Sequence, residues 1–366
     1  MKIDCVKEKL GQALGKAEKI AGRNLALPVL SCLLLEAKGQ SLVIKATNLD
    51  LGIEITLGAK INEEGTAAVS AQILSSFIGG VHTNKNISLS LVDGNLSVST
   101  DKNKTIIKTV AFDDFPLIPV IDNEKKVTIQ SEVLIKGIKA VWYSSAVTSM
   151  KPELSSVYIY EDGDYLVFAA TDSFRLAEKR IHIKKSVGFP PTLIPFKNAA
   201  EIVRVFEDVK EDIEILFSKT QISLSADGVR LVSRVIDGTF PDYKQIIPKE
   251  FKTEVVVLKQ DIINANKLAN IFSDSFNQMN IKADPEAKIF YVKTKNADIG
   301  ENLNHIDAAV TGESVDVNFN YKYIVDCLQS IETDSLSLNF NGLSKPMIMK
   351  PIGDQSFIYL VMPMNR

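Results

Sequence analysis

An internal repeat limits the folds that are open to this sequence. When residues 27–48 are set over residues 151–172 without a gap, eight of the 22 positions are identical, at an offset of 124. The dipeptide Phe115-Pro116 recurs as Phe240-Pro241 at an offset of 125. A segment that returns at a fixed spacing indicates that the chain folds as copies of one structural unit.

A third copy is fainter. At an offset of 123, Ile194 falls on Val317, and residues 213–217 (IEILF) fall on residues 336–340 (LSLNF). Three units of roughly 120 residues agree with the two or three domains expected for 366 residues. Charged polar stretches near residues 121–126 and 249–254 suit linkers. We therefore expect domains over residues 1–122, 123–251 and 252–366.

The hydrophobic pattern predicts two helices in each unit. Apolar residues recur with a helical period in six segments, which are 7–23, 70–82, 131–146, 195–206, 259–272 and 319–330. Between them the sequence alternates apolar and polar residues with turn signals, as in short antiparallel strands. The prediction is an α+β fold with about eight strands in each unit. One strand–helix–strands motif would then occur six times.

Composition and motifs argue against an enzyme, a metal site or a cofactor. The three histidines and three cysteines are scattered, and none has metal-ligand spacing. Neither a glycine-rich phosphate loop nor a G-x-S-x-G elbow is present. No run approaches membrane-spanning or signal-peptide length, and isolated cysteines in apolar surroundings are typical of buried thiols in a reducing cytoplasm. We expect a cytoplasmic protein without a metal or cofactor.

One polar stretch, residues 171–180 (TDSFRLAEKR), resembles an active site. It follows an apolar run and brings hydroxyl, carboxylate and guanidinium groups close together. A nucleophilic Ser173 needs a base beside it, and its neighbour is Phe174. A hydrolase that uses Ser173 or the pair Asp113-Asp114 therefore stays a minor alternative to a polar turn or a docking surface.

The distribution of charge is more informative than its sum. The net charge is −3, yet the predicted helix segments are positive in total, so the remaining residues are more acidic than the whole. Basic helices suit contact with a polyanion such as nucleic acid. Lysines on solvated helix faces are the plainer explanation, and the charge pattern alone does not separate the two.

Four motifs together resemble the bacterial DNA polymerase III β subunit, the sliding clamp family. They are residues 151–157 (KPELSSV), 171–177 (TDSFRLA), 240–248 (FPDYKQIIP) and 359–366 (YLVMPMNR). They occur in the order of that family, the last at the C-terminus, and the resemblance extends over essentially all 366 residues. The resemblance implies a head-to-tail homodimer in which six similar domains close into a ring, with helices inside and sheets outside.

The resemblance also implies a function without catalysis. Such a ring encircles duplex DNA without reading its sequence and tethers the replicative polymerase, which makes synthesis processive. Its partners would be the polymerase α subunit, the clamp loader, and other polymerases and repair proteins that carry short clamp-binding peptides. Arg23 and Lys197 fall where the family places basic residues towards DNA.

A peptide-binding cleft and a dimer interface follow from the same resemblance. At the interface, Ile107 of the first domain would meet Ile271 and Phe272 of the third domain of the partner copy. The cleft would receive partner peptides on a mainly apolar wall, formed by Leu154, Thr171, Ser173, Phe174, Arg175, Leu176, Pro241, Ile246, Leu360, Val361, Met362, Pro363 and Met364.

The sequence departs from the family at several cleft and loop positions. Ser173-Phe174 stands where the family usually has Gly-His, and Asn365-Arg366 replaces an Arg-Leu ending. Pro152 and Glu153 replace aromatic residues of the family. Phe174 makes the cleft more apolar, which leaves its peptide preference open. A non-catalytic repeat scaffold that does not encircle DNA is the remaining alternative.

Overall fold

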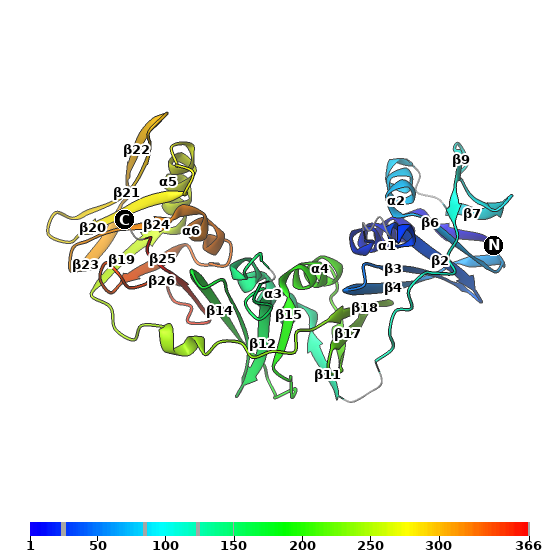
Figure 1. The fold of residues 1–366 in the computed structure, drawn as a ribbon, viewed down its shortest axis with the longest axis horizontal. Helices are drawn as coiled ribbons and strands as arrows, with labels where there is room; N and C mark the ends of the chain where they lie inside the picture. Colours follow the sequence, from blue (N-terminus) through cyan, green and yellow to red (C-terminus); the bar gives the residue numbers. More distant parts are fainter. Residues whose placement is uncertain (23–26, 83–85, 122–124, 149, 365–366) are drawn as a thin grey trace. The chain divides into compact units, whose positions relative to one another are not determined.

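A computed structural model describes residues 1–22, 27–82, 86–121, 125–148 and 150–364. Within these residues there are six α-helices (Figure 1), which are α1 (Lys7–Ile20), α2 (Ala71–Gly80), α3 (Ser131–Val141), α4 (Phe196–Phe206), α5 (Lys259–Ile271) and α6 (Tyr321–Leu328). Each one follows directly on a strand and is followed by a run of antiparallel strands. The expected strand–helix–strands motif therefore occurs six times.

The chain forms two compact units. The first unit contains residues 1–135 and 197–237, and the second contains residues 136–196 and 238–366. The predicted central domain therefore contributes its two halves to different units. The predicted domains follow the repeats along the chain. The compact units differ from them because each nine-stranded sheet contains strands of two neighbouring repeats.

The first unit is built on two antiparallel sheets. In spatial order, the five-stranded sheet contains β5 (Lys60–Glu63), β1 (Lys2–Val6), β7 (Asn86–Val92), β8 (Asn95–Ser99) and β9 (Lys104–Ile107). The nine-stranded sheet contains β10 (Thr109–Val110), β6 (Gly65–Ser70), β2 (Cys32–Lys38), β3 (Ser41–Thr47), β4 (Leu51–Gly58), β18 (Val229–Arg234), β17 (Gln221–Ala226), β16 (Asp212–Phe217) and β11 (Lys125–Gln130). The pair β4–β18 joins strands of the first and second repeats.

The second unit repeats this plan. Its nine-stranded sheet contains β15 (Thr192–Pro195), β12 (Ser156–Asp162), β13 (Tyr165–Thr171), β14 (Arg175–His182), β27 (Phe357–Val361), β26 (Met347–Pro351), β25 (Ser335–Phe340), β19 (Thr253–Leu258) and β23 (Ala308–Gly312). A four-stranded sheet contains β22 (Gly300–His305), β21 (Ile289–Asn296), β20 (Gln278–Asp284) and β24 (Val315–Asn320). Here β14–β27 joins the second and third repeats.

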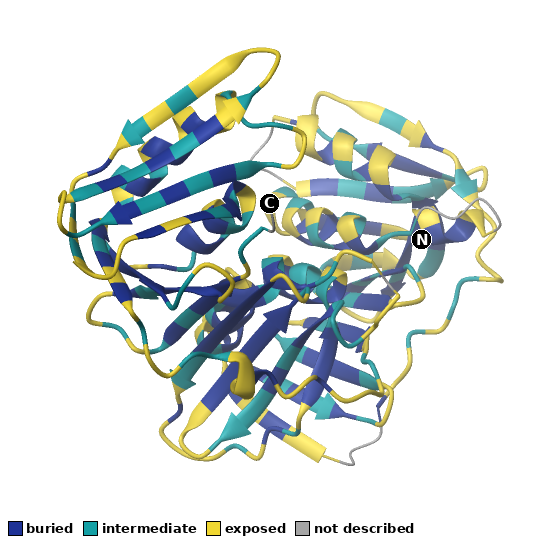
Figure 2. Cartoon of the chain, turned by 60° about the vertical axis from the view of Figure 1, so that its left-hand side comes forward, coloured by how far each residue is buried: buried dark blue, intermediate teal, exposed yellow. Residues whose placement is uncertain are grey.

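Apolar periodicity accounts for the packing. In α1 the buried residues are Leu10, Ala13, Leu14, Ala17 and Ile20, which lie on one face of a helix and pack over β3 and β4. Most positions of the nine-stranded sheets are buried, whereas hairpin ends are exposed (Figure 2). The three cysteines are free and buried, as expected from their apolar surroundings.

One predicted helix is shorter than expected. Residues 131–146 were expected to be helical, but α3 ends at Val141 and a 3₁₀-helix follows over Trp142–Ser144. The hydroxyl of Ser145 donates to the carbonyl of Ser156 at 3.2 Å, and Ser144 and Ser145 are buried. Serine side chains that bond to the backbone compete with helix continuation, which explains the early end.

Candidate peptide-binding cleft and nucleic-acid interface

The polar stretch forms a tight turn between β13 and β14. The hydroxyl of Thr171 donates to the carbonyl of Arg175 at 2.6 Å, and Asp172 Oδ1 accepts from the amides of Phe174 and Arg175 at 2.9 and 3.0 Å. Ser173 adopts a φ of 79°, a left-handed conformation that is unusual for a serine. The polar side chains of the stretch therefore build the turn, which holds the Phe174 ring outward with 61% of the residue exposed.

The floor of the candidate cleft is the strand pair β14–β27. Arg175 lies opposite Val361, and Leu176 lies opposite Leu360. Beyond the strand, the amide of Met362 donates to the carbonyl of Phe174 at 2.8 Å. The C-terminal segment is thus fixed beside the turn, and the exposed side chains of Phe174 and Met362 belong to neighbouring backbone segments.

A segment between β18 and β19 supplies another wall. Tyr243 donates to the buried carboxylate of Glu178 on β14, and its hydroxyl lies 2.9 Å from that of Tyr160. The ring of Phe240 stacks on Tyr158 with centroids 4.9 Å apart. Burial raises the pKa of Tyr243, so its hydroxyl stays protonated and donates. These contacts anchor the segment that carries Pro241 and Ile246, whose side chains remain exposed.

Arg175 lies beneath the turn and is almost fully buried. Its Nε donates to Asp172 at 3.0 Å, and its Nη1 donates to Asp326 on α6 at 2.6 Å. The guanidinium lies over the ring of Tyr323, with its central carbon 4.4 Å from the ring centroid. Burial alone would lower the pKa of Arg175, but the neighbouring Tyr359 and the two carboxylates raise it above its usual value. Arg175 is therefore an anchored cation beneath the cleft.

The predicted cleft residues separate into a floor and a rim. All of them belong to the second unit. The floor is buried and contains Thr171, Arg175, Leu176, Leu360 and Val361. The rim is exposed or partly exposed and contains Leu154, Ser173, Phe174, Pro241, Ile246, Met362, Pro363 and Met364. An apolar rim over an ordered floor suits the docking of a short apolar peptide.

Sequence reasoning missed the residues that hold this arrangement from the third repeat. Tyr323 and Asp326 contact Arg175 from α6. The amide of Met364 donates to the carbonyl of Asn318 on β24 at 2.8 Å. Spacing along the chain gives no signal for these contacts, because Arg175 and Asp326 are 151 residues apart.

The geometry does not assemble a catalytic group at this turn. Both carboxylate oxygens of Asp172 are engaged by Phe174 and Arg175, and the hydroxyl of Thr171 is bound to the backbone. Asp113 and Asp114 are both exposed on a loop. Among the described residues, no three His, Cys, Asp or Glu side chains are grouped so as to hold a metal ion.

A partly basic groove lies between α1 and α4 in the first unit. Its volume is about 260 Å³, and its charged lining residues are Lys16, Lys19, Glu201, Arg204 and Asp208. Burial raises the pKa of Glu201 although Arg204 and Lys19 oppose the shift, and Glu201 Oε2 is buried without a hydrogen-bond partner in the described structure. Lys197 is exposed in the first turn of α4. Arg23, the other predicted DNA contact, lies outside the described residues.

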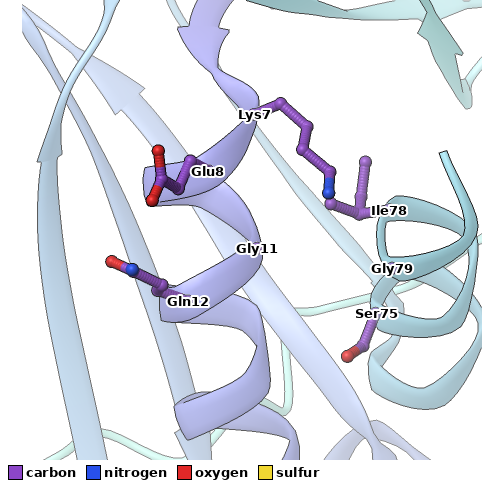
Figure 3. Close-up of a pocket in the computed structure, with 7 residues that line it drawn as sticks. All are labelled: Lys7, Glu8, Gly11, Gln12, Ser75, Ile78 and Gly79. Carbon is purple, nitrogen blue, oxygen red and sulfur yellow. The ribbon is translucent and has the colours of Figure 1, made fainter. Parts of the chain in front are cut away.

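A second groove separates α1 from α2 (Figure 3). Its volume is about 470 Å³, and Gly11 and Gly79 leave it open. The side chain of Lys7 reaches towards Ile78, whereas Glu8 and Gln12 point to the other side of α1 (Figure 3). Among the described residues, the polar side chains that line the groove are one amine, one carboxylate, one amide and one hydroxyl, from Lys7, Glu8, Gln12 and Ser75.

The two predicted dimer surfaces each contain exposed apolar side chains at a sheet edge. In the first unit β9 is an edge strand, and Ile107 is buried (5% exposed), whereas its neighbour Ile106 is 56% exposed. Successive residues of a strand face opposite sides, so Ile106 is the residue available to a partner. In the second unit Ile271 is 60% exposed, Phe272 is partly exposed, and Leu268 and Leu303 are also exposed near the edge strand β22.

Comparison with known proteins gives one consistent result. Family models of the DNA polymerase III beta subunit match the chain in order, with the N-terminal domain at residues 1–119, the central domain at 128–242 and the C-terminal domain at 244–365. The beta sliding clamp of Synechococcus elongatus is 24% identical over 374 aligned positions, which cover 100% of this chain and 99% of the relative. That of Staphylococcus aureus is 24% identical over 357 positions, 95% and 94% of the two chains.

Solved structures agree with the fold. The DNA polymerase III beta subunit from Thermotoga maritima superposes with a TM-score of 0.92 at 25% identity and covers 100% of this chain and 99% of its own. The DNA polymerase sliding clamp from Bacillus subtilis gives a TM-score of 0.90 at 21% identity, with the same coverage.

Proposed function

The chain belongs to the family of DNA polymerase III beta subunits, and on this premise we propose that it is a sliding clamp that holds a DNA polymerase on duplex DNA. The observation that carries the proposal is the succession of three beta-subunit domain matches over residues 1–119, 128–242 and 244–365. No observation favours a scaffold that does not encircle DNA.

The proposed mechanism is topological. Two copies close head to tail into a ring, and DNA is retained because the ring surrounds it. Such a ring needs only weak contact with phosphates and can slide, because phosphate contacts carry no sequence information. A net charge of −3 is compatible with this role, since α1 carries four lysines against two glutamates, and α4 carries Lys197 and Arg204 against Glu201.

Ring closure would join the edge strand β9 of one copy to the region of α5 and β22 of the other. Exposed apolar side chains at both sites support this pairing, with Ile106 on one side and Ile271 and Leu303 on the other. An edge strand presents unpaired backbone groups that a second strand can satisfy. Burial of these apolar side chains would then stabilise the dimer.

The protein would act without catalysis, as a docking platform. Partner polymerases, the clamp loader and repair proteins would each insert a short peptide between Phe174, Ile246 and Met362. These three side chains are exposed, and methionine adapts to different apolar partners. We place this function in the cytoplasm with buried, reduced thiols. No helix in the described residues is long and apolar enough to cross a membrane.

A peptide titration tests the cleft. A short synthetic peptide rich in glutamine, leucine and phenylalanine is titrated calorimetrically into the wild type, Phe174→Ala and Met362→Ala. Each substitution should cost about 2 kcal/mol if the residue is a hot spot, or roughly thirtyfold in Kd. Leu117→Ala is the control, because Leu117 is exposed in the first unit. Unchanged affinity in both cleft variants would place the docking site elsewhere.

A further inference from the structure

The turn that forms the cleft recurs in the first unit, between β3 and β4. There the hydroxyl of Thr47 donates to the carbonyl of Leu51 at 2.7 Å, and Asn48 Oδ1 accepts from the amide of Leu51 at 2.8 Å. Leu49 has a φ of 77°, close to the 79° of Ser173. Each of these bonds has its counterpart in residues 171–175, so the two turns have the same backbone construction.

The likeness extends to the neighbouring strand. In the first unit the amide of Arg234 donates to the carbonyl of Asp50 at 3.0 Å, just as the amide of Met362 donates to the carbonyl of Phe174. Of the five turn positions only the threonine is shared, and the last residue is the apolar Leu51 in one turn and Arg175 in the other. Because the Leu51 turn forms the same hydrogen bonds without a charged side chain, the turn itself does not require the guanidinium of Arg175.

The guanidinium of Arg175 instead connects the turn to α6. Its Nη1 lies 2.6 Å from Asp326 Oδ2, and its central carbon lies over the ring of Tyr323. Asp326 is 40% exposed at its side chain and can be hydrated without a partner, whereas the Arg175 side chain is only 9% exposed. Without the Asp326 carboxylate, Arg175 would keep Asp172 as its counter-ion, so the charge would remain paired while the link to α6 is reduced to the contact with Tyr323.

Phe174 lies next to this link in the sequence and is held by backbone contacts on both sides. Phe174 precedes Arg175, and its backbone is bound on one side to Asp172 and on the other to Met362. Its ring is the exposed part. The turn's own hydrogen bonds set its backbone shape, whereas the contacts of Arg175 with Asp326 and Tyr323 fix where the turn as a whole lies against α6. Since only the competent arrangement binds, apparent affinity falls with its population.

We propose that Asp326 is a positioning residue of the peptide cleft, which acts through Arg175 to hold Phe174 beside the C-terminal segment. The proposal rests on the proposed function of the cleft as a peptide site. Asp326 itself need not touch the peptide, because its contact is with the buried guanidinium.

A double-mutant cycle tests it. The Kd of the glutamine-, leucine- and phenylalanine-rich peptide is measured for the wild type, Asp326→Asn, Phe174→Ala and the double variant. Asp326→Asn should raise Kd about tenfold, as when the competent population falls to a tenth. In the Phe174→Ala background it should add almost nothing, because the residue that it positions is gone. Equal losses in both backgrounds would overturn the proposal, as would no loss at all.

A matched control and a second readout complete the test. Asp50→Asn removes an aspartate–arginine pair at the other turn, where Asp50 Oδ1 lies 3.2 Å from Arg234, and should leave Kd unchanged. Hydrogen exchange at the Met362 amide needs no peptide and should become faster in Asp326→Asn while the melting temperature stays near that of the wild type. If the wild type binds no peptide, the proposed docking function fails. If Asp326→Asn leaves the exchange rate of the Met362 amide unchanged, the positioning role of Asp326 fails, whether or not the wild type binds the peptide.

Discussion

Replacement of Ile271 by alanine should weaken the dimer, because the exposed side chain of Ile271 would be buried by the partner copy. Full burial of an isoleucine side chain is worth about 1.5–3 kcal/mol. Ile271 is 60% exposed in the single chain, so its burial by a partner would contribute about 1–2 kcal/mol at each interface. A head-to-tail ring of two copies has two such interfaces, and Ile271→Ala should therefore cost about 2–4 kcal/mol in total. The dissociation constant of the dimer would rise roughly 30- to 700-fold.

Sedimentation velocity over a dilution series measures this shift. Ile352→Ala is a matched control, because Ile352 is also an exposed isoleucine and lies in the turn between β26 and β27, away from α5 and β22 in the sequence. The dimer of this control variant should have the same dissociation constant as the wild type. A dimer of Ile271→Ala that persists to the same dilution as the wild type would refute the interface, and an equal loss in both variants would show that the effect is general.

Three further predictions follow from individual residues. Ile107→Ala should lower the free energy of unfolding by about 2–5 kcal/mol in urea titrations because the side chain is in the core, whereas Ile106→Ala should lower dimer affinity instead. Lys19→Gln with Lys197→Gln should reduce the salt slope of DNA binding by up to ~2, equally for unrelated sequences in fluorescence titrations. The raised pKa of Glu201 means that its protonated form stabilises the fold below about pH 4.5 and that this contribution is lost as pH rises through the folded pKa. Glu201→Gln should therefore gain stability relative to the wild type at pH 7 but not at pH 4 in urea unfolding.

The sequence alone located most of the elements. All six predicted helices are present, and their ends differ from the expected bounds by only a few residues apart from α3. This succeeded because the buried residues of each helix recur with a helical period, which is a local property. The early end of α3 depends instead on the contact of Ser145 with Ser156, a strand residue that no local pattern brings near.

The candidate cleft was predicted from motif resemblance, but the contacts among its residues could not be predicted from the sequence. The separation into floor and rim follows from the pairing of β14 with β27, whose paired residues are 178 to 186 positions apart in the sequence. The expectation that Ile107 lies at the interface rested on resemblance alone, which does not show which of two neighbouring residues faces outward from the strand; in the structure Ile106 is exposed and Ile107 is buried. The phase of the strand is set by the pairing of Leu96 with Ile107, which buries Ile107.

Retention on circular DNA tests the central claim most directly. The protein is assembled on a nicked plasmid with a clamp loader, passed through a gel-filtration column in high salt, and compared with the same complex after the plasmid is cut once. A ring that surrounds DNA should stay on the circular plasmid and slide off the linear molecule. High salt weakens the ionic contacts between protein and phosphates, but it does not release a closed ring from a closed circle. Equal retention on circular and linear DNA, or loss from both, would contradict the proposed clamp.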